Sequence, residues 1–142
     1  MYKTYKGNET MKIKRKLLIG LATIFIVAVS LVIYFLVPQK ILHTDEQVAK
    51  ITLFDGNSGR YATVTDAEEI AYIVAMFNDK KFSATGIAAF RIGFSMRIKY
   101  FDEKENEILH FIAGKNTIRY RGLFYEPQDG AIDYTYLEKR VK

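Results

Sequence analysis

Hydrophobic residues gather in one block near the N-terminus and alternate with polar residues over the rest of the chain. The block is a run of 21 residues, 17–37, without a charged side chain. At about 1.5 Å of rise per residue, a helix over this run is roughly 31 Å long, close to the bilayer hydrocarbon thickness of about 30 Å. Thr23 and Ser30 are compatible with insertion because their hydroxyls can bond backbone carbonyls within the helix. The pattern predicts a transmembrane helix at 17–37, stopped by Pro38.

After a short polar stalk at 38–47, the chain has short patterns typical of strands separated by turn residues. The clearest is 90–100, where every second residue is apolar and the others are mostly polar or charged. Such alternation indicates a strand with one buried face and one solvated face. The predicted strands are 48–54, 60–64, 90–100, 107–113, 117–121 and 123–125.

Two helices are predicted among these strands. Thr65 and Glu68 have the spacing of a capping box, which predicts a helix through about Phe77. A short C-terminal helix is predicted with its inner face at Ile132, Tyr136, Leu137 and Val141. The segment 82–89 contains Ser-Ala-Thr-Gly and is predicted to be a loop. The element order predicts an α+β fold, in which 48–142 form a small two-layer sandwich of about five or six antiparallel strands and two helices.

The position of the positive charge indicates how the chain is oriented. The net charge is +5, yet residues 38–142 hold 15 basic and 15 acidic residues, so the excess lies in the tail 1–16. A balanced domain argues against nucleic-acid binding, which needs clustered positive charge on the binding domain. By the positive-inside rule, the tail is cytoplasmic and 48–142 form an extracytoplasmic domain. The basic residues that give this topology signal are Lys12, Lys14, Arg15 and Lys16.

A cleaved signal peptide is the alternative to a permanent anchor. The best small-x-small cleavage site ends at Ser30, and cutting there would expose an apolar new terminus. Met11 opens a basic and then apolar stretch, so it is a second candidate for the start of translation.

The residue types needed for common active sites are scarce. The chain has no Cys, which excludes thiol catalysis, cysteine-ligated metals and a lipid-modified cysteine. Its two histidines, His43 and His110, do not have metal-ligand spacing. Ser95 follows Gly93 as in a nucleophile elbow, but the second Gly is missing. We therefore expect no cofactor, no metal and no enzymatic activity.

A set of basic residues is the main candidate for a binding surface. Period-two alternation puts three of them on one face of the strand 90–100 and two on one face of the strand 117–121. If both strands share the sheet, its open face carries a positive stripe for an anionic wall polymer, a lipid headgroup or an acidic partner. Solvated charges that discourage edge pairing are the alternative. The residues are Arg91, Arg97, Lys99, Arg119 and Arg121.

An N-terminal anchor followed by a compact α+β domain resembles the layout of small proteins of Gram-positive bacteria. No motif names a family, so the resemblance assigns no residue roles. The leading hypothesis is a membrane-anchored, extracytoplasmic binding or modulating module of a bacterial-type cell envelope, with the bilayer and a protein or envelope component as partners. The alternatives are an envelope enzyme with an unfamiliar site and a small membrane-associated immunity or stress protein.

Overall fold

The computed structural model describes residues 3–89 and 95–142, with side chains described from Met11 onward. The chain forms two compact units, Met1–Leu36 and Val37–Lys142. In the first unit, a single helix, α1, covers Lys3–Leu36. Its part Met11–Leu36 is long and apolar enough to cross a membrane, and the protein buries none of it. The predicted apolar helix is therefore confirmed as a candidate membrane anchor.

The two hydroxyls inside the apolar run are satisfied as the sequence predicts. Thr23 donates to the Ile19 carbonyl at 2.9 Å and Ser30 donates to the Ile26 carbonyl at 2.8 Å. Because both bonds stay within the helix, neither hydroxyl needs water or a partner helix.

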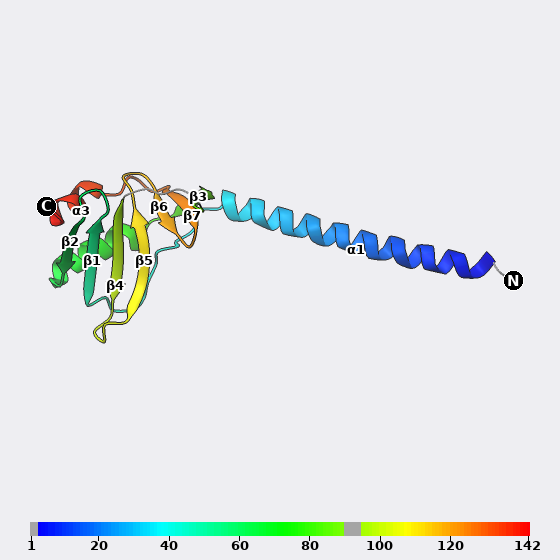
Figure 1. Ribbon diagram of the computed structural model, residues 1–142, viewed down its shortest axis with the longest axis horizontal. Coiled ribbons are helices and arrows are strands. Elements are labelled where there is room, and N and C mark those ends of the chain that lie inside the picture. Colours follow the sequence, from blue (N-terminus) through cyan, green and yellow to red (C-terminus); the bar gives the residue numbers. More distant parts are fainter. Residues whose placement is uncertain (1–2, 90–94) are drawn as a thin grey trace. The chain divides into compact units, whose positions relative to one another are not determined.

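The described residues of the second unit form one seven-stranded antiparallel sheet, with the strand order β2-β1-β4-β5-β6-β7-β3. The two strands at its edges, β2 and β3, are joined in sequence by the helix α2, which lies behind the sheet in Figure 1. An α+β fold is confirmed, with more strands than the five or six predicted. The strands are β1 (Lys50–Asp55), β2 (Arg60–Val64), β3 (Phe82–Ile87), β4 (Met96–Phe101), β5 (Glu107–Ala113), β6 (Ile118–Tyr120) and β7 (Leu123–Pro127).

The helix α2 (Ala67–Asn78) covers one face of the sheet through aromatic packing. The Phe77 ring lies 4.8 Å from the Phe111 ring, and the Phe111 ring lies 5.8 Å from that of Tyr100. The buried Tyr100 hydroxyl donates to the carbonyl of Ile73 on α2 at 3.5 Å. These contacts place the core between α2 and the inner faces of β4 and β5.

The short helix α3 (Tyr134–Arg140) packs beside α2. The Tyr72 and Tyr136 rings are 4.6 Å apart, and the Arg140 guanidinium lies 2.5 Å from the Glu69 carboxylate. Tyr134 and Leu137 are buried, while Tyr136 is only half-buried. The prediction of a C-terminal helix is correct, but Tyr134 takes the inward position that was expected for Tyr136.

Two local predictions need correction. The cap of α2 is Asp66, not Thr65, because the Asp66 carboxylate accepts the backbone N–H groups of Glu68 and Glu69 at 3.1 and 3.0 Å. The segment predicted as a loop at 82–89 contains the strand β3, which pairs with β7. Its Phe82 side chain is buried, and long-range pairing thus outweighs the weak strand preference of its small residues.

The segment 38–47, predicted as a stalk, packs on the domain. Gln39 and Phe82 exchange two backbone hydrogen bonds of 2.8 Å, and Leu42 is fully buried. The buried Leu42 therefore attaches this mostly polar segment to the hydrophobic core of the domain.

Candidate functional site

The face of the sheet opposite α2 carries the polar half of the alternation in β4. Met96, Ile98 and Tyr100 are buried toward α2, so the residues between them point to the other face. Arg97 on that face is exposed and Lys99 is half-exposed. We call this surface the open face. The alternation predicted for 90–100 is thus confirmed over the part that β4 covers.

Strand register sets the side chains of the open face in a row across the sheet. Arg97 pairs with Phe54 of β1 on one side and with Ile112 of β5 on the other. Ile112 pairs in turn with Arg119 of β6, which pairs with Phe124 of β7. We call these five residues the cross-sheet row. Since neighbouring strands lie about 4.8 Å apart, the backbones of its two arginines are about 10 Å apart with one aliphatic side chain between them.

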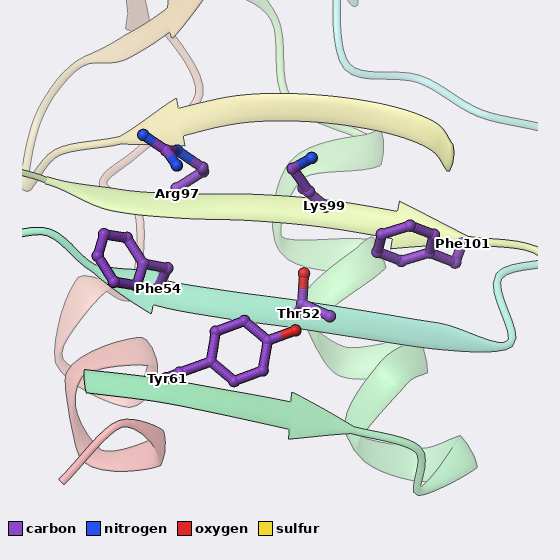
Figure 2. Close-up of a pocket in the computed structure, with 6 residues that line it drawn as sticks. All are labelled: Thr52, Phe54, Tyr61, Arg97, Lys99 and Phe101. Carbon is purple, nitrogen blue, oxygen red and sulfur yellow. The ribbon is translucent and has the colours of Figure 1, made fainter. Parts of the chain in front are cut away.

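A hollow of about 330 Å³ lies at one end of this row. Its centre is Thr52 of β1, a buried polar residue whose small side chain leaves space above it. Figure 2 shows aromatic rings around this position and the two cations of β4 along one side. The hollow therefore combines apolar ring surface with positive charge. Its lining residues are Thr52, Phe54, Tyr61, Arg97, Lys99 and Phe101.

The two cations of the hollow have different partners. The Lys99 ammonium lies 2.6 Å from the Glu107 carboxylate, and this hydrogen bond lowers the pKa of Glu107. The Arg97 guanidinium lies 5.5 Å from the centre of the Phe54 ring. Among the residues that the structure describes, no carboxylate lies within salt-bridge distance of Arg97. Of these two cations, Arg97 is therefore more open to an anionic ligand.

His110 lies on the open face beside Lys99, with which it pairs across β4 and β5. Its Nδ1 is 3.8 Å from the Glu107 carboxylate. Partial burial is the main cause that lowers the pKa of His110, and the neighbouring Lys99 charge adds to it. A neutral imidazole at neutral pH fits a surface residue of the sheet. His43, the other histidine, contacts Asp45 in the segment before β1 and is remote in sequence from this surface.

The five predicted basic residues are only partly brought together. Arg97, Lys99 and Arg119 lie on strands that share the open face. Arg121 is not in a strand, because it forms a two-residue turn with Gly122 between β6 and β7. Both turn residues have positive φ, 48° and 80°, and the Arg121 guanidinium lies over the Tyr120 ring. Arg91 lies outside the described residues.

Sequence reasoning missed the aromatic part of the surface. Phe54 and Tyr61 fall in predicted strands, and Phe101 lies one residue beyond the predicted strand 90–100. Which rings meet across the sheet depends on pairing between distant segments. Tyr61 was detectable in part, because in the predicted strand 60–64 it alternates with the apolar residues Ala62 and Val64 and so belongs to the outer face. No group of three metal-ligating side chains occurs within the described part of the chain.

Two other hollows lie at α2, and polar groups of the first already have local partners. In one of about 390 Å³, Lys80 donates to the carbonyls of Asp129 and Gly130, and the Tyr72 hydroxyl donates to Asp133. The other, of about 440 Å³, runs along the first half of α2 and the segment before β1. The open face therefore remains the better candidate for a binding site.

Comparisons of the chain with protein-family models, curated proteins and solved structures gave no match.

Proposed function

We propose that this chain is a membrane-anchored, non-enzymatic module whose C-terminal domain lies outside the membrane and binds or modulates a component of a bacterial-type cell envelope. The anchor is the apolar part of α1. Four basic residues just before the run 17–37 support a cytoplasmic N-terminus, because positively charged flanks are retained on that side.

The observation that carries the binding role is the cross-sheet row. It puts Arg97 and Arg119 on the same face of the sheet, with Ile112 between them and aromatic rings at both ends. Arginine and aromatic residues are enriched where proteins bind partners, since they combine apolar contact with directed hydrogen bonds. A surface that served only to keep the domain soluble would not require aromatic rings and arginine side chains aligned across neighbouring strands.

A charge-reversal experiment tests the role of this surface. The double variant Arg97→Glu/Arg119→Glu would be compared with the unchanged protein by crosslinking in intact membranes and capture of the full chain. We expect the crosslinked component to be lost, because the variant repels an anionic partner. Lys115→Glu is the matched control, since Lys115 is an exposed cation in the turn between β5 and β6. Equal capture by all three proteins would remove the open face from the proposal.

The topology is tested separately with cysteine labelling, because the natural chain has no Cys. The variant Asn116→Cys carries one thiol at an exposed turn of the domain. We expect a membrane-impermeant maleimide to label it in intact cells. Labelling only after the membrane is opened would place the domain in the cytoplasm. An N-terminal epitope tag retained on the same product excludes signal cleavage.

A further inference from the structure

The hollow on the open face displays more aromatic surface than a solvated sheet requires. Phe54, Tyr61 and Phe101 come from three different strands and surround the small side chain of Thr52 (Figure 2). The Tyr61 hydroxyl has no hydrogen-bond partner within the described residues. An exposed ring with an unused hydroxyl is characteristic of a surface that binds a ligand with both apolar and polar parts.

The charge around the hollow is asymmetric. Lys50 and Lys99 flank Phe101, and each contacts a carboxylate, Glu105 and Glu107 respectively. At the other end, Arg97 lies over the Phe54 ring and has no such partner in the part of the chain that the structure describes. The end formed by Phe54, Tyr61 and Arg97 therefore keeps a net positive charge beside ring surface. A ligand that suits it has an apolar face and an anionic group at its edge.

We infer that the hollow binds an acidic sugar unit of an anionic glycan. A pyranose ring has C–H faces that pack on aromatic rings, a polar rim for the Tyr61 hydroxyl, and in an acidic sugar a carboxylate or phosphate for Arg97. The volume of about 330 Å³ is near the lower limit of small-molecule sites and suits one ring with its substituents. This inference rests on the proposed function, since a domain outside the membrane meets such polymers.

The cross-sheet row extends the inference from one sugar to a polymer. From Arg97 the row continues over Ile112 to Arg119 and Phe124, which repeats a cation beside an aromatic ring about 10 Å away. A glycan that crosses the strands can place a second anionic group near Arg119. Longer oligomers should therefore bind more tightly than a single unit, because the second contact is intramolecular.

The test is a binding titration with the full chain in nanodiscs of neutral phosphatidylcholine. The probe is a set of hyaluronan oligosaccharides, which alternate a uronic acid with a neutral amino sugar. Chitin oligosaccharides are the control without charge, and polyglutamate is the control with charge but no sugar rings. We expect hyaluronan alone to bind through the domain, more strongly with length and more weakly with added salt.

Variants assign the binding to the hollow. We expect Arg97→Gln to weaken hyaluronan binding about tenfold, as for the loss of a hydrogen bond between charged groups. Tyr61→Ala should weaken it about fivefold through the lost ring contact. Lys115→Gln removes an exposed charge outside the hollow and should change little. All of these proteins carry the same basic tail, so differences between them report on the domain.

Three results would overturn the inference: polyglutamate binding as strong as hyaluronan binding and weakened equally by Arg97→Gln, equal binding of chitin oligosaccharides, or hyaluronan binding that Arg97→Gln and Tyr61→Ala leave unchanged. The first indicates a general polyanion surface, the second a neutral-sugar site, and the third binding by the tail. If hyaluronan fails while Arg97→Glu/Arg119→Glu still loses its crosslinked component, the ligand class is wrong and the proposed function stands. If both experiments fail, the open face has no binding role.

Discussion

Replacing Phe111 by Ala tests whether the contact between α2 and the sheet stabilises the C-terminal domain. The Phe111 side chain is 1% exposed and its ring contacts both Phe77 and Tyr100. Truncating a buried Phe to Ala costs about 3–5 kcal/mol, because apolar contacts are lost and a cavity remains. Domains of this size are stable by about 5–15 kcal/mol, so the variant should lose a large share of its free energy of unfolding.

Urea unfolding of the full chain in detergent measures this loss. The chain has ten Tyr and no Trp, so tyrosine fluorescence and near-ultraviolet circular dichroism report on the domain, whereas α1 remains helical. Phe111→Leu is the conservative control and should cost about 1–2 kcal/mol, since it keeps most of the volume. A loss below about 1 kcal/mol for Phe111→Ala would refute the reasoning, because the ring cluster would then not hold α2 to the sheet.

Three further predictions use the same unfolding assay. Because Asp66 caps α2, Asp66→Ala should lower the free energy of unfolding by about 1 kcal/mol and Thr65→Ala by less than about 0.5 kcal/mol. Equal losses for the two variants would contradict this assignment of the cap. Burial raises the pKa of the Tyr100 hydroxyl in the folded domain, so the unfolded chain loses this hydroxyl proton at lower pH. The free energy of unfolding should therefore fall above about pH 10, by up to about 1.4 kcal/mol per pH unit. Tyr100→Phe should flatten that fall in a pH series, and an unchanged slope would assign it to other tyrosines. Gly122→Ala should cost about 1 kcal/mol, because Gly122 has a φ of 80°; an unchanged midpoint would show that the turn tolerates a Cβ.

The features that sequence predicts well here are the local ones. The apolar run gives the second part of α1, the turn at 55–59 gives the hairpin of β1 and β2, and the alternation in 90–100 gives β4. Each depends on neighbouring residues in the chain. The cap at Asp66 shows the usual limit of such reasoning, because Thr65 and Asp66 are both good caps and only the start of α2 decides between them.

The features that sequence could not supply depend on distant partners. β3 has a Gly and small residues, and its register with β7 shifts between Ala84 and Gly86, so only pairing with a segment some 40 residues later makes it a strand. The cross-sheet row has the same origin, because alternation tells which side chains share a face of one strand but not which residue lies opposite. The period-two pattern also extends the predicted strand 117–121 through Arg121, although the turn with Gly122 begins at that residue.

The strand order has a consequence for how the domain is made. β2 and β3, the two edges of the sheet, are synthesised before β4, β5, β6 and β7, which fill the space between them. The neighbour of β3 in the sheet is β7, so β3 cannot join the sheet until the chain through Pro127 is available. Tertiary assembly must therefore wait for nearly the whole domain, and until then two edge strands and the apolar side of α2 are exposed. A chain stopped at Ala89 should be degraded or aggregate rather than persist as a smaller domain.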